Sequence, residues 1–389
     1  MTFSPQRRRL LRGLAAAPLA ASLAPWAVAA APAQRLLILV FLYGGNDGFN
    51  TWVPYANPMY FRVRPNLAVP RDAVLKVTDG HGFHPSLAPL MSVWEARELA
   101  LVQGIGYPLV TQQHYRDIEI AFTANDGELA SEGWASRALA RLGADGPAAL
   151  ALDMLDIREA DPMGPFRGER VGVVQVHHVQ ELLARRRVAD CVLTTNARGG
   201  PALARLHGEL AAAPLATRFP DDPFGQSARA AVELARADRS LPVIHLVLNG
   251  RDGDKHHSVD THWDQLKYHG DALARLAEGL AALRAGLREI GRWDETLVVT
   301  YDEFGRSPVE NGDRGTHHGL ANTHFVLGGR VAGGLLGAPP PVEKIWPIGG
   351  PAPAVDTRAL WSAVVRDWWG LTPADVFGRA YPALRILRA

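Results

Sequence analysis

Carboxylate and histidine side chains gather in three short segments of this chain of 389 residues. The residues concerned are Asp47, Asp260, His262, Glu303, His317 and His318. They lie in GGNDGFNT, in DTH, and in YDEFG with the GTHHG that follows it after a short loop, and long stretches of chain separate these three segments. A divalent metal ion is bound by oxygen and imidazole ligands that converge from such distant parts of a chain. The pattern therefore predicts a metal centre.

Each of these residues also has a purely structural interpretation. Asp47 can cap the backbone N–H groups of a turn, and Asp260 can cap the helix that follows it. Glu303 can form an ion pair with Arg306, and the paired histidines can be turn residues between glycines. The metal interpretation depends on whether the fold brings the three segments together.

Four apolar runs predict the strands that would do so. They span residues 36–43, 99–102, 243–248 and 297–300. A run without polar residues is typical of a strand buried on both faces, as in a parallel α/β sheet. Ligands bind beyond the carboxyl ends of such strands, and the polar segments follow the first, third and fourth runs directly or after a short loop.

Helical periodicity appears between the last two runs. Over residues 263–288 the leucines at 266, 273, 276, 280, 283 and 287 draw one apolar stripe. A strand, a long helix and a second strand within sixty residues predict a βαβ crossover. A further helix is predicted over residues 357–369, covering one face of the sheet.

The first 31 residues have the features of an export signal. Arg7, Arg8, Arg9 and Arg12 precede an alanine-rich stretch that ends in A-x-A cleavage sites. The paired arginines predict export through the twin-arginine machinery and a periplasmic or secreted protein. No later run reaches about 18 apolar residues, so no stable membrane insertion is expected after cleavage. Residues 32–389 are predicted to form a single domain, with residues 126–238 as a lid or an insertion.

The remaining composition excludes several classes of partner. The whole chain has 41 Lys and Arg against 40 Asp and Glu, and four of the arginines lie in the signal. The body is therefore slightly acidic, which argues against nucleic acid as a partner. Cys191 is the only cysteine, so neither an intrachain disulfide nor a zinc site built from several thiolates can form.

Four segments of the chain resemble those of a known protein family. The segments LLILVFLYGGNDGFNTWVP, GFHPSLAPL…GIGY, DTHWDQ and TYDEFGRSPVENGDRGTHHGLANTHFVLGGRVAGGLLG are similar to those of twin-arginine-exported proteins of unknown function. That family is distantly related to the alkaline phosphatase-like superfamily of sulfatases and phosphopentomutases. The resemblance implies an alkaline phosphatase-like α/β/α sandwich with a largely parallel central sheet flanked by helices.

The resemblance also implies a ligand set. The implied metal ligands are Asp47, Asp260, His262, Glu303 and His318. They would hold one or two divalent ions, with zinc, manganese, calcium and magnesium all open. Three positions differ from the pattern: Phe304 stands where the superfamily has a metal-binding histidine, His317 where relatives have aspartate, and Gln113 where relatives have serine.

Because that serine is missing, the sequence leaves open which side chain would attack the substrate. Thr111 is the nearest hydroxyl and Thr51 is the other candidate, while His114 and His317 are candidates for proton transfer or for supporting the ligands. We therefore expect a metal-dependent hydrolase of phosphate or related esters, acting on a small-molecule or glycan ester. The alternative is a metal-stabilised, non-catalytic secreted protein for binding or assembly. A third interpretation has no metal at all.

Overall fold

The computed structural model describes residues 35–127, 130–142, 148–152, 163–176, 179–185, 192–195, 210, 213–249, 258–342 and 349–389. The predicted export signal and Cys191 lie outside the described residues. Among the helices that the structure describes, none combines the length and the apolar character needed to cross a membrane.

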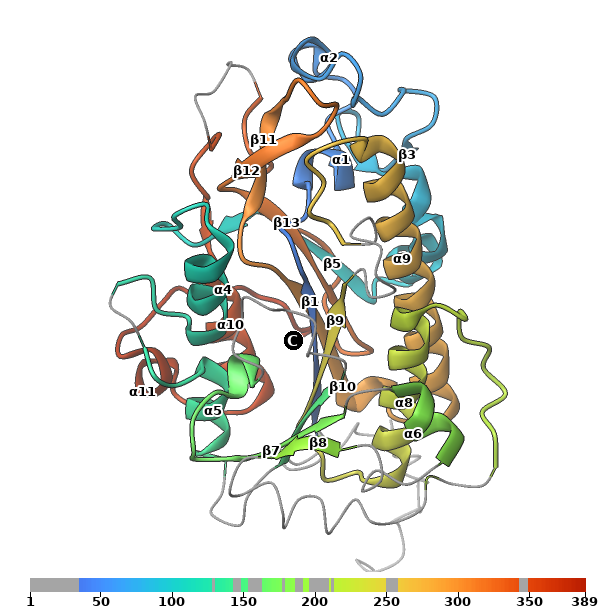
Figure 1. Cartoon of the computed structure of the whole chain (residues 1–389), viewed down its shortest axis with the longest axis vertical. Coiled ribbons are helices and arrows are strands. Elements are labelled where there is room, and N and C mark those ends of the chain that lie inside the picture. The colour runs from blue at the N-terminus through green and yellow to red at the C-terminus, as the bar shows by residue number, and fades with distance from the viewer. Residues whose placement is uncertain are drawn as a thin grey trace, which may run out of the picture. The chain divides into compact units, whose positions relative to one another are not determined.

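A ten-stranded mixed sheet forms the centre of the described structure (Figure 1). Its strand order is β14-β5-β13-β10-β1-β9-β6-β7-β8, and β15 pairs with β5. Only the pairings of β13 with β10 and β5, and of β8 with β7, are antiparallel, so the sheet is largely parallel. Its strands are β1 (Leu36–Leu42), β5 (Leu99–Gly106), β6 (Ala148–Leu152), β7 (Gly172–Val176), β8 (Val192–Thr195), β9 (Val243–Leu248), β10 (Thr296–Tyr301), β13 (Asn322–Leu327), β14 (Gly334–Gly337) and β15 (Val355–Asp356).

Two small sheets lie outside the central one. The antiparallel hairpin of β11 (Gly305–Glu310) and β12 (Thr316–Gly319) directly follows β10. The other small sheet contains β2 (Trp52–Val53), β3 (Leu75–Lys76) and β4 (Gly82–Phe83). The hairpin carries one of the histidines of the predicted metal centre.

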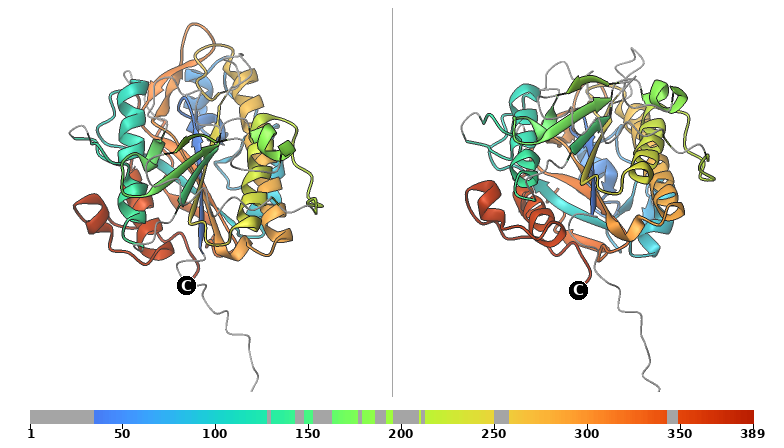
Figure 2. Two further views of the ribbon diagram at one scale, coloured as in Figure 1. Left: turned by 60° about the horizontal axis from the view of Figure 1, so that its bottom comes forward. Right: turned by 90° about the horizontal axis from the view of Figure 1, so that it is seen from below.

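Helices cover both faces of the central sheet (Figure 2). The alternate side chains of β1 that begin at Leu36 pack in one core with α3 (Met91–Glu95), α6 (Val179–Arg185), α8 (Pro223–Ala237), α9 (Gln265–Glu289) and the 3₁₀ turn η3 (Pro85–Leu90). Those that begin at Leu37 pack with α4 (His114–Thr123), α5 (Trp134–Leu139), α10 (Thr357–Ala363), the π-helical turn η9 (Val364–Trp368) and α11 (Pro373–Phe377). The remaining short helices are α1 (Gly48–Thr51), α2 (Pro58–Val63), η5 (Gly164–Phe166) and η8 (Trp293–Glu295).

This arrangement confirms the predicted fold class. All seven residues of β1 are fully buried, because β9 and β10 pair with it in parallel on either side. The predicted crossover is also present: α9 connects β9 to β10, with β1 inserted between them. One leucine of the predicted stripe differs from the rest. Leu266 is 45% exposed, whereas the other five leucines are buried.

The middle of the chain adds strands that the sequence did not reveal. The described parts of residues 126–238 include β6 and β7, which extend the central sheet beyond β9, and α8, which packs against α9. These parts therefore share the sheet and the core with the rest of the described chain. The predicted boundaries of a lid or an insertion stay a prediction.

His245 is a buried titratable group in the centre of this sheet. Its ring lies near Phe41, Phe122 and Phe166, and its Nε2 atom is 2.7 Å from the Tyr301 hydroxyl. Burial lowers the pKa of His245 to about 3, so the folded protein keeps the ring neutral in mild acid. An unfolded chain takes up this proton near pH 6.5.

We therefore expect His245 to make the protein less stable as the pH falls from 6.5 towards 3. The unfolded state binds one more proton over this range, which lowers the free energy of unfolding by up to about 1.4 kcal/mol per pH unit. His245→Gln should reduce this slope. Urea unfolding of both proteins between pH 4 and pH 7 measures the difference, and equal slopes would show that the ring titrates normally.

Candidate metal centre

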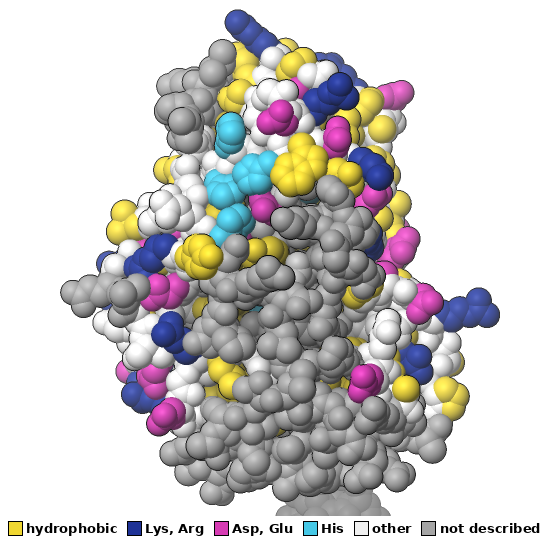
Figure 3. Space-filling model, in the orientation of Figure 1, with side chains coloured by type: hydrophobic (Ala, Val, Ile, Leu, Met, Phe, Trp, Pro, Cys, Tyr) yellow, Lys and Arg dark blue, Asp and Glu magenta, His cyan; other side chains and the backbone are white. Residues whose placement is uncertain are grey.

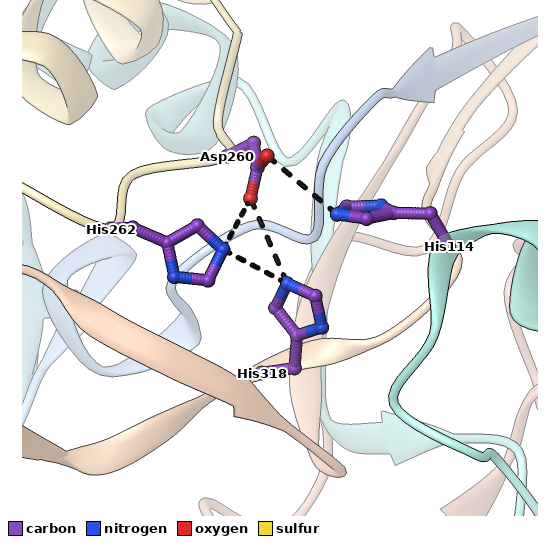
Figure 4. A group of neighbouring side chains, drawn as sticks. All are labelled: His114, Asp260, His262 and His318. Atoms are coloured by element: carbon purple, nitrogen blue, oxygen red, sulfur yellow. Dashed lines mark hydrogen bonds and ion pairs between the residues drawn. The ribbon is translucent and has the colours of Figure 1, made fainter. Parts of the chain in front are cut away.

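Four of the polar side chains singled out by the sequence lie together in the structure (Figure 4). His114 is the first residue of α4, Asp260 and His262 precede α9, and His318 lies in β12. Each offers one atom suited to a metal ion, and these four atoms lie within 4.8 Å of one another. We call these four residues the His–Asp cluster.

The distances inside the cluster suit a single ion. His262 Nε2 is 3.1 Å from Asp260 Oδ1 and 3.0 Å from His318 Nε2. Asp260 Oδ2 is 3.6 Å from His114 Nε2, and Asp260 Oδ1 is 3.8 Å from His318 Nε2. Ligands about 2.0–2.1 Å from a tetrahedral zinc ion are roughly 3.3–3.4 Å apart. The distances between the donor atoms of the cluster are therefore close to those between the ligands of one metal ion.

Hydrogen bonds on the far side of two imidazoles orient them towards this centre. His318 Nδ1 donates to the Gln112 carbonyl at 2.7 Å, and His114 Nδ1 is 2.9 Å from Glu303 Oε1. A carbonyl oxygen only accepts, so Nδ1 of His318 carries the proton and the neutral ring directs its Nε2 lone pair at the cluster. Burial lowers the pKa of His318, which favours that neutral form. Such partners are typical of metal-binding histidines.

Arg306 holds Asp260 in its ionised form. Its fully buried guanidinium donates to Asp260 Oδ1 and to the Gly44 carbonyl, and also to the carbonyls of Gly45 at 2.9 Å and Thr316 at 3.1 Å. Burial by itself raises the pKa of Asp260. The contacts with His262 and His318 and the charge of Arg306 outweigh it and hold the pKa well below its usual range.

Glu303 supports the cluster from behind. Its Oε1 atom accepts from the Gly44 N–H and contacts His114, both at 2.9 Å, while Oε2 is buried and has no hydrogen-bond partner among the described residues. Burial raises the pKa of Glu303. The pKa of His114 is raised as well: burial lowers it, but the hydrogen bond to Glu303 and the charge of that carboxylate raise it more.

Phe304 fills the space next to this pair. Its ring stacks on His318 with centroids 4.2 Å apart and lies 5.0 Å from the ring of His114. The phenyl group stands where the superfamily pattern has a metal-binding histidine, and it offers no ligand atom. It instead fixes the planes of two cluster rings by packing.

Asp47 has different partners from those expected of a metal ligand. Its carboxylate caps α1 by accepting from the N–H groups of Phe49 and Asn50, as in the structural interpretation of this residue. Arg64 donates to both of its oxygens, at 2.5 and 3.1 Å, and Gln265 donates to Oδ2. The Arg64 guanidinium thus supplies the positive charge that the resemblance assigns to an ion.

The two other predicted residues lie at the margin of the cluster. His317 is exposed on β12, and its ring centroid is 6.5 Å from that of His262. The Thr111 hydroxyl donates at 3.0 Å to Asp117 Oδ1, which also accepts from the Thr111 N–H. Asp260 does not cap α9, because the residue at that position is Asp264.

Sequence reasoning missed Arg64, Gln265 and Gln112, and it assigned Arg306 to the wrong carboxylate as an alternative partner of Glu303. These residues act through burial and through contacts across the fold. Nothing in an arginine-rich sequence distinguishes a buried arginine from a solvated one. Gln112 contributes only its backbone carbonyl, which no side-chain pattern predicts.

Comparison with known proteins gives one family model and several structures. The family described as "Protein of unknown function (DUF1501)" matches residues 184–344, less than half of the chain. A search of curated proteins finds no match. The match to a family of unknown function agrees with the resemblance found in the sequence.

The similar structures include three proteins of bacterial origin. They are the lipoteichoic acid synthase LtaP from Listeria monocytogenes (11% identity, TM-score 0.43, covering 90% of this chain and 76% of that one), the PsFucS1 sulfatase from Pseudoalteromonas sp. (11%, 0.37, 91% and 73%) and the phosphonate monoester hydrolase SpPMH from Silicibacter pomeroyi (12%, 0.38, 89% and 77%). At these values we take nothing about activity or individual residues from them.

The buried pair of Arg64 and Asp47 leads to a prediction about stability. Arg64→Met leaves the Asp47 carboxylate buried without its cation, which should lower the free energy of unfolding by about 3–5 kcal/mol. Adding Asp47→Asn should recover part of the loss, because the unpaired charge is then gone. Urea unfolding measures both. Arg62→Met on the exposed face of α2 is the control and should change stability by less than about 0.5 kcal/mol. An equally small effect of Arg64→Met would contradict the pairing.

Proposed function

We propose that the chain is a metal-dependent hydrolase of phosphate or related esters, with one divalent ion held by the His–Asp cluster. The observation that carries the proposal is the convergence of four donor atoms from three separate parts of the chain, two of them on rings whose far nitrogens are already bonded. Three imidazoles and one carboxylate favour zinc over manganese, magnesium and calcium, which prefer oxygen ligands.

A single ion is the stoichiometry that the described residues support. The His–Asp cluster is the group of this kind found among them. The Asp47 carboxylate is already bonded to Arg64, and Asp302 accepts from the Asn46 N–H and from Asn322 while it contacts His324. Asp47 and Asp302 are therefore engaged by these groups, and Glu303 contacts His114 through its Oε1 atom.

The ion would remain accessible to a substrate. The side chains of the four cluster residues are between 16% and 31% exposed, so solvent reaches them from one side. A bound divalent ion supplies Lewis-acid stabilisation of the charge that develops on the ester oxygens.

The chain's own residues would hold the reacting groups and move protons. Arg306 keeps Asp260 ionised, and Glu303 keeps the His114 ring directed at the centre. A water oxygen attacks the phosphorus while the water gives up a proton, the bond to the leaving-group oxygen breaks, and that oxygen takes up a proton. We assign both transfers to His317, which is exposed beside His262: its ring accepts the proton of the water and passes it to the leaving-group oxygen.

The second candidate function is a structural ion without turnover. Four protein ligands complete a tetrahedron, as in structural zinc sites, and this favours the non-catalytic alternative.

In either case we propose that residues 1–31 direct export through the twin-arginine machinery to the periplasm or beyond. Replacing Arg8 and Arg9 by lysine should leave the protein in the cytoplasm, as fractionation would reveal.

Elemental analysis of the purified protein tests the metal centre. We expect about one ion per chain, and its loss from both Asp260→Asn and His318→Ala. Asp47→Asn should keep the ion, because Asp47 is bonded to Arg64. Chelation should lower the melting temperature of the wild-type protein and not that of His318→Ala.

The outcomes of these measurements separate the alternatives. No ion in the wild-type protein, or an ion retained in both cluster variants, would overturn the metal centre. An ion without turnover on phosphate, sulfate and phosphonate esters would favour the structural role. Turnover that disappears with the ion would support the hydrolase.

A further prediction concerns the attacking group. Thr111→Ala should keep kcat within about threefold of the wild-type value, because its hydroxyl is bonded to Asp117 and water attacks instead. Loss of a covalent nucleophile typically lowers kcat by several orders of magnitude. Steady-state kinetics measures the difference, with Thr111→Ser as the conservative control. A loss of a thousandfold that serine restores would assign the attack to Thr111.

A further inference from the structure

Large apolar side chains are exposed close to the His–Asp cluster. The large apolar residues that are exposed, among the described ones, are Leu109, Tyr115, Trp263, Leu266 and Leu335. All except Leu335 lie within five residues of His114 or His262 in the sequence. Figure 3 shows apolar side chains on both sides of the histidine group. Exposed apolar side chains that gather at one place mark a binding surface more often than scattered ones do.

Two of these residues are direct neighbours of cluster histidines. Tyr115 follows His114 and is 68% exposed, and Trp263 follows His262 and is 43% exposed. Neighbouring Cα atoms are about 3.8 Å apart, so each aromatic side chain starts at the edge of the cluster. A substrate bound at the cluster is therefore within reach of both rings.

The fold explains why these apolar groups are exposed. Tyr115 shares a stripe of α4 with Ile118 and Phe122, which are buried against the sheet. Tyr115 lies in the first turn of the helix and is exposed, whereas Ile118 and Phe122 lie further along it and are buried. Leu266 and Leu273 likewise share a stripe of α9, and Leu266 is exposed whereas Leu273 is buried.

The two helices belong to opposite faces of the sheet. α4 packs in the core on one face and α9 in the core on the other, and the cluster takes its residues from the start of α4, from the segment before α9 and from β12. Tyr115 and Trp263 therefore approach the cluster from two sides. An organic group bound there would have an aromatic ring on each side.

We propose that Tyr115 and Trp263 bind the organic part of the substrate and that this part is a saccharide. The proposal rests on the proposed function, since it places the ester at the cluster. A sugar ring has an apolar C–H face for an aromatic ring and hydroxyl groups at its edges for the polar ends of Tyr and Trp. The partly exposed cluster suits a chain of sugars that lies across the site.

Binding of neutral oligosaccharides to the full chain tests the proposal without requiring turnover. An array of such oligosaccharides identifies ligands, and calorimetry measures their affinity. Tyr115→Ala and Trp263→Ala should each weaken binding about tenfold or more. Leu335→Ala, an exposed apolar residue on β14, is the matched control and should bind as the wild type does. All three variants should retain the wild-type metal content and melting temperature.

A kinetic comparison then separates ring stacking from general effects. For phosphate esters of sugars the two variants should raise KM with little change in kcat, and for acyclic alkyl phosphates neither value should change. No saccharide binding by the wild-type protein, or equal binding by the variants, would overturn the proposal. The proposal would also be overturned if Tyr115→Ala and Trp263→Ala weakened the binding of phospholipid vesicles or of aryl phosphates and left the binding of saccharides unchanged.

The failure of the proposed function would give a different result. A wild-type protein that lacks the ion and turnover but binds saccharides through these rings would refute the hydrolase and keep the saccharide surface. A wild-type protein that hydrolyses alkyl, aryl and sugar esters equally, with no effect of either variant, would keep the hydrolase and refute the saccharide surface.

Discussion

The guanidinium of Arg306 is a fully buried cation, and the site is built around its need for acceptors. It binds the carbonyls of Gly44 and Gly45 after β1, the carbonyl of Thr316 on β12 and the carboxylate of Asp260 before α9. A buried charge without such partners would cost several kcal/mol. The folded state therefore fixes these three segments relative to one another, and the ligands they carry come with them.

Close backbone approach at the end of β1 is a condition for this arrangement. Gly44 and Gly45 both have positive φ angles, of 109° and 78°. A Cβ atom on Gly44 would collide with Asp260, and one on Gly45 would collide with the Phe304 ring. The tight turn thus brings the carbonyls to Arg306 while it leaves room for a cluster ligand and for the ring that packs on His318.

A second buried ion pair, Arg64 with Asp47, has a role separate from that of Arg306 with Asp260. Arg64 neutralises Asp47 and also donates to the carbonyls of Ser307 at 2.8 Å and Pro308 at 2.8 Å, so it connects α2 to β11. In this way Asp47 stabilises the loop after β1, while Asp260 remains the carboxylate that faces the three histidines. Two aspartates that the sequence presents as equivalent ligands have separate roles because different groups surround them.

Residue patterns alone predicted the parts of this fold that depend on periodicity. The buried strands β1, β9 and β10 and the leucine stripe of α9 follow from the apolar runs, and their shared carboxyl edge follows from parallel pairing. The capping interpretation, however, describes Asp47 and not Asp260. That choice depends on which arginines are buried and where they reach, and such contacts between distant residues leave no mark in the local sequence.

The charges around the cluster explain why an anionic ester is the expected substrate. Asp260 is the one carboxylate of the His–Asp cluster, and Arg306 offsets its charge. Glu303 is buried behind His114, with its Oε1 atom 2.9 Å from His114 Nδ1. A divalent ion held by neutral imidazoles would then keep most of its charge uncompensated and directed towards solvent. Such a centre attracts a phosphate or sulfate ester more strongly than a carboxylate-rich site would, while the apolar rings of Tyr115 and Trp263 select the group that carries the ester.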